Sequence, residues 1–215
     1  MTTLIGIADD HFSFLQSISL LLDSSSHMKV VIKAHDGQEL LDQLALAPER
    51  PGICLVDIHM PRSNGPATVE RLSRDYPAIK TIALSMEHDD TALIGMLRAG
   101  CLGWWLKFLS PDELVRTIHE VDQYGFYNAD PLNIYYRQQP GYHEQEEIEL
   151  TGQERRLLQL YCMDLTEQEV HTKMGVPDQE TRVICSGLYE KLHVRSRPGA
   201  VMEAFHKGLV DRNLD

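Results

Sequence analysis

Short apolar runs alternate with amphipathic stretches along the first 126 residues of the chain. The apolar runs lie at residues 4–8, 30–34, 53–56, 80–84 and 103–106. Between them, apolar positions recur at the spacing of amphipathic helices, at residues 12–22, 38–46, 66–74, 90–99 and 111–122. Short runs bounded in this way are typical of buried strands. The alternation therefore predicts a doubly wound α/β domain, in which helices cover both faces of a five-stranded parallel sheet.

From residue 150 onward the pattern changes to short helices with clear start signals. Residues 151–154 (TGQE) and 166–169 (TEQE) both have the sequence of a capping box, and apolar positions at helical spacing follow each of them. Residues 175–178 (GVPD) end the second helix and begin a third, which extends to about Leu192, and residues 200–208 form the last. This order predicts a small all-α bundle with a helix-turn-helix, whose second helix can enter a major groove of DNA.

Residues 127–149 separate the two halves and show no sustained hydrophobic period. They combine Pro, Gly and Gln with five acidic residues and one basic residue, which gives this segment a net charge of −4. The composition predicts a linker with a short helical piece at residues 132–137. We therefore expect three parts: a domain over residues 1–126, a linker over 127–149 and a second domain over 150–215.

Charge and cysteine content narrow the class of protein. The chain carries 20 Lys and Arg against 32 Asp and Glu, a net charge of −12, which argues against binding of polyanions through net charge. Its four cysteines, at positions 54, 101, 162 and 185, form no CxxC pair and no metal-binding spacing. Such a pattern predicts reduced thiols and a cytoplasmic protein. No apolar run approaches the ~20 residues of a membrane span, and we expect no signal peptide and no association with a membrane.

Five polar residues follow the predicted strands directly. Asp9 and Asp10 come after the first strand, whereas Asp57, Ser85 and Lys107 mark the ends of the third, fourth and fifth. Because the carboxyl ends of parallel strands share one edge of the sheet, we expect these side chains to converge there. Three clustered carboxylates raise one another's pKa unless a cation neutralises them, and a hard divalent ion such as Mg²⁺ suits oxygen ligands. Alternatively, the acidic residues only cap the helices that follow.

Short motifs extend this pattern over the whole first half. They are IADDH at residues 7–11, LVDIHMP at 55–61, NG at 64–65, ALSM at 83–86 and GWWLK at 103–107. Together they resemble the receiver domain of two-component response regulators. The combination of ADDH with the segment that ends in Lys107 resembles the NarL, FixJ and LuxR subfamily. The resemblance implies a flavodoxin-like fold and a sensor histidine kinase as partner. It also implies that the protein is not an enzyme, beyond slow autodephosphorylation at most.

The resemblance assigns roles to the residues at the strand ends. It implies that Asp57 accepts the phosphoryl group, that Asp10 and Asp57 bind Mg²⁺ directly, and that Asp9 acts through water. His59 would supply its backbone carbonyl as a further ligand. A phosphohydrolase that forms an aspartyl phosphate is the nearest enzyme alternative, but such an enzyme usually has a second acid where this chain has His59.

Three further residues complete the phosphorylation site that the resemblance implies. Lys107 would pair with the phosphoryl oxygens as a compact positive charge, and the Ser85 hydroxyl would hydrogen-bond to them. Trp104 occupies the family's switch position, where its ring could fill space that Ser85 leaves. Packing in the core is the alternative role for Trp104. Phe108 departs from the polar residue that usually follows the lysine.

The second half carries its own family resemblance. The motifs are LT at 150–151 with ER at 154–155, LT at 165–166 with EV at 169–170, and Leu188, KL at 191–192, VRSR at 194–197 and AV at 200–201. Over residues 150–210 they resemble the LuxR-type helix-turn-helix output domain. The resemblance implies transcription regulation through an operator, bound by a homodimer that forms on phosphorylation.

The surface that would contact DNA is less basic than the family pattern. The candidate contacts are Arg182, Val183, Ser186, Lys191, Arg195 and Arg197. A solvated charge is the alternative role for Arg182, and a brace for the last helix is the alternative for Arg195 or Arg197. Gly187 lies inside the recognition helix, where glycine costs ~1 kcal/mol relative to alanine. These features support an alternative function, a phosphorylation-controlled protein-interaction module with weakened or lost DNA binding.

Overall fold

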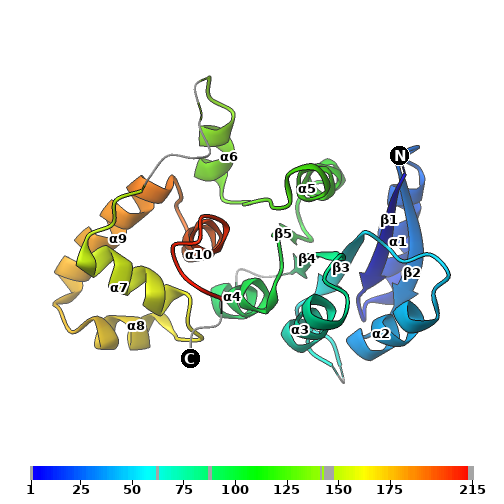
Figure 1. Cartoon of the computed structure of the whole chain (residues 1–215), viewed down its shortest axis with the longest axis horizontal. Coiled ribbons are helices and arrows are strands. Elements are labelled where there is room, and N and C mark those ends of the chain that lie inside the picture. Colours follow the sequence, from blue (N-terminus) through cyan, green and yellow to red (C-terminus); the bar gives the residue numbers. More distant parts are fainter. Residues whose placement is uncertain (1, 62, 87–88, 141, 143–147, 213–215) are drawn as a thin grey trace. The chain divides into compact units, whose positions relative to one another are not determined.

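The chain folds into two compact units, residues 1–127 and residues 128–215. The computed structural model describes residues 2–61, 63–86, 89–140, 142 and 148–212 (Figure 1). No helix in these described ranges is long and apolar enough to cross a membrane.

Unit 1 contains a five-stranded sheet in which every pairing is parallel. Its strands are β1 (Thr3–Ala8), β2 (Met28–Ala34), β3 (Ile53–Asp57), β4 (Lys80–Ser85) and β5 (Gly103–Leu106). Its helices are α1 (Phe12–Asp23), α2 (Gly37–Leu46), α3 (Gly65–Asp75), α4 (Asp90–Ala99) and α5 (Pro111–Tyr124). The predicted α/β architecture is confirmed, because each predicted strand and helix matches an observed one to within two residues at either end.

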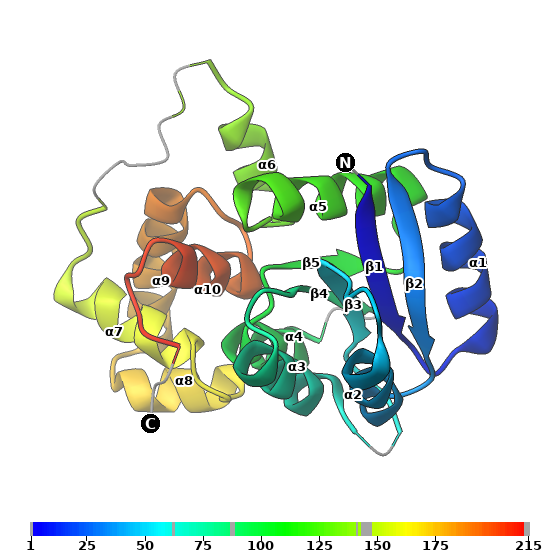
Figure 2. The same cartoon turned by 45° about the vertical axis from the view of Figure 1, so that its right-hand side comes forward.

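The strand order β2-β1-β3-β4-β5 places β3 in the centre of the sheet, next to β1. All five residues of β3 are buried, as expected for a strand that helices cover on both faces. α1 packs against α5, whereas α2 packs on α3 and α3 on α4, and Figure 2 shows helices on the two faces of the sheet. Ligands of such sheets bind where the strand order reverses, and this point lies between β1 and β3.

Unit 2 is helical. It consists of α6 (Pro131–Arg137), α7 (Gly152–Tyr161), α8 (Glu167–Met174), α9 (Asp178–Leu192) and α10 (Arg197–His206). Both predicted capping boxes are present, Thr151 with Glu154 and Thr166 with Glu169. Gly175 ends α8 at φ 69°, in the left-handed region that glycine adopts without strain. Helix α8, the turn after it and helix α9 therefore follow the helix-turn-helix order that the sequence predicts.

The last helix begins earlier than predicted, at Arg197 rather than at residue 200. The Ser196 side chain accepts a hydrogen bond from the backbone N–H of Gly199 and so caps the helix. Pro198 falls in the first turn, where a missing N–H donor costs nothing. A proline therefore marks the beginning of this helix and not a boundary before it.

Residues 128–133 belong to a buried polar cluster with α10, although they lie within the predicted linker. Asn128 donates through Nδ2 to the Gly199 carbonyl and to Glu203 Oε1, both at 3.0 Å, and Asn133 Nδ2 donates to the same Glu203 oxygen at 3.0 Å. Asp130 Oδ2 accepts a hydrogen bond of 2.9 Å from the backbone N–H of Arg195, which follows α9. We call Asn128, Asp130, Asn133 and Glu203 the α10 polar cluster. Within the predicted linker, residues 141 and 143–147 lie outside the described residues.

Candidate functional site

The carboxyl edge of the sheet in unit 1 gathers three carboxylates and one ammonium group. Asp9 and Asp10 follow β1, Asp57 ends β3, and Lys107 follows β5. Lys107 Nζ lies 2.6 Å from Asp9 Oδ2 and 2.9 Å from Asp57 Oδ2. The structure thus brings together four of the residues that the sequence places at strand ends. We call Asp9, Asp10 and Asp57 the acidic cluster.

Backbone contacts fix the positions of these side chains. The backbone N–H of His11 donates to Asp9 Oδ1 at 2.9 Å, which orients the Asp9 carboxylate at the beginning of α1. After β3 the chain folds back tightly, because Gly65 N–H donates to the Ile58 carbonyl at 3.0 Å. A Cβ atom at Gly65 would lie 2.5 Å from the Asp57 carbonyl oxygen. Only glycine permits this close approach, so the NG motif shapes the loop that carries Asp57.

The cluster is electrostatically unbalanced. Burial raises the pKa of the Asp57 carboxyl; Lys107 opposes this shift through its charge and hydrogen bond, while the charges of Asp9 and Asp10 add to it. One ammonium group cannot neutralise three carboxylates, and an excess of two negative charges remains when all three are ionised. Such an excess favours binding of a cation.

The donor set fits a hard divalent cation. Ligand atoms of Asp9, Asp10, His11 and Asp57 all lie within 4.8 Å of one another. The three carboxylates supply the oxygen ligands that Mg²⁺ prefers. His11 instead orients the cluster, since its Nδ1 lies 3.0 Å from Asp10 Oδ1 and 3.4 Å from Asp9 Oδ1.

The remaining predicted residues of the site are Ser85, Trp104 and His59. Each lies in, or shortly after, one of the strands β3, β4 and β5. Ser85 ends β4 and is buried, and its carbonyl accepts a hydrogen bond from Lys107 N–H at 2.7 Å. Trp104, in β5, is buried and pairs with Ala83 of β4. His59 follows β3 with an exposed side chain. Sequence reasoning missed Phe14, whose ring centroid lies 4.7 Å from Lys107 Nζ.

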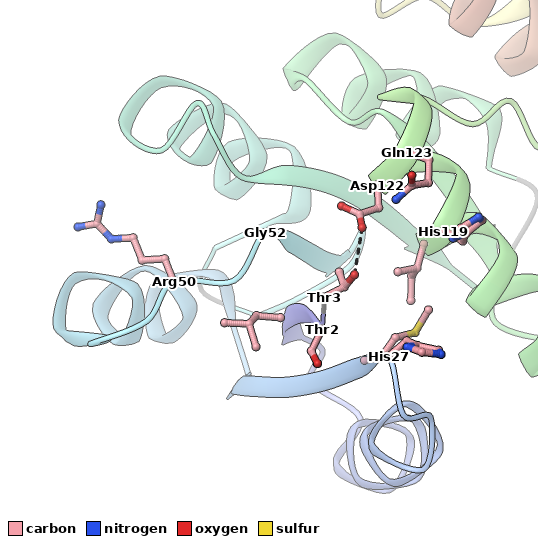
Figure 3. Close-up of a pocket in the computed structure, with 11 residues that line it drawn as sticks. Thr2, Thr3, His27, Arg50, Gly52, His119, Asp122 and Gln123 are labelled. Atoms are coloured by element: carbon pink, nitrogen blue, oxygen red, sulfur yellow. Dashed lines mark hydrogen bonds between the residues drawn. The ribbon is translucent and has the colours of Figure 1, made fainter.

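A separate pocket lies at the opposite, amino edge of the sheet (Figure 3). It has a volume of about 590 Å³ and is lined by the beginning of β1, the loop before β2 and the end of α5, including His27 and His119. Thr3 Oγ1 donates to Asp122 Oδ2 across it at 3.0 Å. None of the acidic cluster lines this pocket, so it is not part of the carboxyl-edge site.

In unit 2, three of the predicted DNA contacts share the exposed face of α9. Arg182, Val183 and Ser186 are all exposed, and 68% of the Val183 surface is accessible to solvent. Ser186 Oγ donates to the Arg182 carbonyl at 2.9 Å, within the helix. Arg195, after α9, is also exposed. These four residues are accessible to a partner.

Lys191 is half-buried and forms an ion pair within unit 2. Its Nζ lies 2.7 Å from Glu154 Oε2 and donates to the Glu149 carbonyl at 3.0 Å. A Cβ atom at Gly187 would lie 3.0 Å from the other Glu154 oxygen. Glycine inside α9 therefore leaves room for a carboxylate that the lysine requires, which explains a residue that the helix alone would not favour.

Arg197 is buried, with 3% of its surface accessible. Its guanidinium donates to the carbonyl oxygens of Tyr161, Met163 and Leu165, at 2.7–3.3 Å. These carbonyls lie at the end of α7 and in the connection to α8. Of the two roles considered for Arg197, the structure supports the brace, and it corrects the expectation of a DNA contact because the guanidinium does not reach the surface.

Comparison with known proteins identifies the class. The response regulator receiver domain family matches residues 5–119 of the chain. The transcriptional regulatory protein UhpA of Escherichia coli (strain K12) is 30% identical over 198 residues, which cover 88% of this chain and 91% of UhpA. The transcriptional regulatory protein DegU of Brevibacillus brevis is 26% identical over 224 residues, which cover 96% of this chain and 94% of DegU.

Solved structures agree on the fold. The RcsB response regulator of Salmonella typhimurium has a TM-score of 0.56 at 19% identity, over 93% of this chain and 98% of that one. The chain belongs to the response-regulator family of two-component systems. The resemblance to the NarL, FixJ and LuxR subfamily is confirmed, because transcriptional regulators match this chain along nearly its whole length.

Proposed function

We propose that this protein is a transcription regulator that a sensor histidine kinase controls by phosphorylating Asp57. The observation that carries the proposal is the ion pair of Lys107 with Asp57, inside an acidic cluster at the carboxyl edge of the sheet. A buried carboxylate next to a buried ammonium group and two further carboxylates combines a nucleophile with the charges that position a phosphoryl group.

In the proposed transfer, an oxygen of the Asp57 carboxylate attacks the phosphorus of the kinase's phosphohistidine. The new P–O bond forms as the P–N bond breaks, and the imidazole nitrogen that leaves takes a proton from solvent. Lys107 then exchanges its contact with the Asp57 carboxylate for the phosphoryl oxygens, while Asp9 holds the ammonium group in place. The Ser85 hydroxyl, at the end of the neighbouring strand, hydrogen-bonds to a phosphoryl oxygen.

Mg²⁺ would be held by Asp10 and Asp57 directly, by Asp9 through water and by the backbone carbonyl of His59. When bound, the ion would neutralise the excess charge of the acidic cluster and of the phosphoryl oxygens. Trp104 would respond to phosphorylation by moving toward space that Ser85 leaves.

We assign DNA binding to unit 2, with Arg182 and Val183 on α9 contacting base edges and Arg195 contacting phosphate. Support comes from the helix-turn-helix order of α8 and α9, from the exposure of these side chains, and from relatives that are transcriptional regulatory proteins. A homodimer formed on phosphorylation would match a two-fold operator.

One observation favours the protein-interaction alternative. The first turn of α9 carries Asp178 and Glu180, both exposed, and the carboxylates at this end of the helix would repel DNA phosphates. A footprint on the upstream region of the protein's own gene separates the two functions, because only DNA binding protects a defined site.

The phosphorylation itself is tested on the full-length chain with acetyl phosphate and Mg²⁺, followed by intact mass. We expect one added phosphoryl group in the wild type and none in Asp57→Asn, which removes the nucleophile and preserves its size. Undiminished labelling of Asp57→Asn would refute the assignment. Sustained hydrolysis of small phosphoesters by the wild type would instead support the phosphohydrolase alternative.

A further inference from the structure

The Lys107 ammonium group is almost completely removed from water. Only 2% of its side chain is accessible. An ammonium group has three N–H donors, and the carboxylates of Asp9 and Asp57 account for two close contacts, at 2.6 and 2.9 Å. The aromatic ring of Phe14 is a third partner, with its centroid 4.7 Å from Nζ. This distance lies within the range of cation–π attraction, which is strengthened where the cation is desolvated.

Phe14 reaches the site from the first turn of α1, the helix that follows Asp9 and Asp10. Its ring also stacks on Trp105, at 6.3 Å between centroids and an interplanar angle of 29°. Trp105 is buried, and its indole Nε1 has no hydrogen-bond partner among the described residues. The Phe14 ring thus lies in contact with both the cation of the site and a buried aromatic of β5.

We propose that Phe14 is a positioning residue for phosphoryl transfer, whose ring holds the Lys107 ammonium group against Asp57. The inference rests on the proposed function and deepens it. Two carboxylates fix the ammonium group before transfer, but phosphorylation converts one of them, Asp57, into an acyl phosphate. Asp9 and the ring are the two partners that the reaction leaves unchanged, and together they keep the cation in place as charge moves onto the phosphoryl oxygens. A cation that needs no rearrangement stabilises the transition state more effectively.

This role depends on the electrons of the ring and not only on its volume. Leucine at position 14 would fill much of the space without offering a negatively charged face, whereas tyrosine would keep that face. A 3,4,5-trifluorophenylalanine residue would keep the shape and remove most of the negative potential. Phe12 supplies a matched control, because it lies on the same helix with an exposed ring that stacks on His35.

The experiment measures the rate of phosphorylation of the full-length chain by acetyl phosphate with Mg²⁺, using intact mass. We expect Phe14→Leu and the trifluorinated residue to slow the reaction by about 3-fold to 10-fold. Phe14→Tyr should restore the rate to within about 2-fold, and Phe12→Leu should leave it unchanged. A second readout needs no Mg²⁺: the NMR signal of the Lys107 ammonium protons should lose its ring-current shift in Phe14→Leu and keep it in Phe12→Leu.

A wild-type rate in the trifluorinated protein would overturn the inference, whether or not Phe14→Leu is slow, because volume alone would then explain any effect. An unchanged ammonium signal in Phe14→Leu would overturn it as well. Failure of the proposed function has a different signature, since the wild type itself would then take up no phosphoryl group on Asp57.

Discussion

The two units bury carboxylates for opposite purposes. In the acidic cluster of unit 1, Asp9 and Asp57 share a single ammonium group, and Asp10 pairs with His11. In the α10 polar cluster of unit 2, Glu203 accepts from the amides of Asn128 and Asn133. Asp130 accepts from the Ser196 hydroxyl at 2.6 Å and from two backbone N–H groups, those of Leu132 and Arg195.

The contrast distinguishes a ligand site from a structural one. A carboxylate surrounded by neutral donors is stabilised where it stands and needs no ion. Three carboxylates around one ammonium group leave an excess of negative charge that a bound cation must balance. Buried acid is therefore a guide to function only when the donors around it are counted. Counting partners in the same way distinguishes the exposed cations of unit 2 from the buried cation that stabilises its interior.

The largest effect should come from Arg197, the interior cation of unit 2. Arg197→Ala removes four hydrogen bonds, to carbonyls at the end of α7 and in its connection to α8, and leaves a cavity and three carbonyls without this donor. We expect unit 2 to lose about 3 kcal/mol or more of stability, measured by helix circular dichroism during urea unfolding. Arg195→Ala is the matched control, since Arg195 is exposed and its removal should change stability by less than about 0.5 kcal/mol. Equal, small effects of the two changes would remove the distinction between interior and surface cations.

The next effect tests the α10 polar cluster itself. Asp130→Asn keeps the size of the side chain but replaces one acceptor oxygen by a donor, which then faces an N–H or O–H group. The site is tight, because a Cβ atom at Gly199 would lie 2.7 Å from Asp130 Oδ2. We expect a loss of about 1–3 kcal/mol in unit 2. Tryptophan fluorescence reports unit 1 alone, since Trp104 and Trp105 both lie there, and it should not change.

How far the sequence predicts the molecule differs between these two clusters. The strands and the acidic cluster could be predicted because each carboxylate directly follows an apolar run, and parallel strands bring their ends together whatever the helices do. The role of residues 128–133 could not be predicted, because their partners are distant in the sequence. Ser196 lies 66 positions after Asp130, and Gly199 lies 71 positions after Asn128. Asn, Asp and Pro favour turns and linkers locally, and only the tertiary fold reveals that their donors and acceptors match those of α10. The contact of Phe14 with Lys107 could not be predicted for a similar reason, since an aromatic residue in an amphipathic helix is typical of core packing.

Arg182 tests whether unit 2 keeps a functional charge on its surface. Arg182→Ala should cost about 1–3 kcal/mol of specific DNA binding if the guanidinium contacts a base, with relaxed specificity at one position. The loss of a phosphate contact by Arg195→Ala should weaken specific and scrambled duplexes alike and lower the salt slope by about one. Fluorescence anisotropy across a salt series on both duplexes measures this difference. If the phosphorylated wild type prefers no fragment of its genome, DNA reading fails and the protein-interaction function gains support.

The smallest effect is expected for Asp57→Asn in unit 1, which should stabilise the protein, whereas Arg197→Ala and Asp130→Asn should destabilise it. The pKa of Asp57 is raised in the folded state, so folding favours its protonated form. The wild type therefore loses stability as pH rises from the unfolded pKa of about 3.9 through the raised folded value. Asp57→Asn cannot ionise and avoids this loss, while Lys107 keeps its contact with Asp9 at 2.6 Å. With a chelator at pH 7 we expect the variant to be more stable by about 0.5–2 kcal/mol, measured by tryptophan fluorescence in urea.

The same measurement at acid pH and with Mg²⁺ shows where the gain comes from. At a pH low enough to protonate Asp57 in both states, the wild type and Asp57→Asn should unfold alike, because neither carries the charge. Added Mg²⁺ should stabilise the wild type more than the variant, since the variant has lost one of the carboxylates that would hold the ion. A variant that is less stable than the wild type at pH 7 without Mg²⁺ would mean that Asp57 stabilises unit 1 as Asp130 stabilises unit 2. The acidic cluster would then be a structural cluster too, and its excess charge would no longer argue for a ligand.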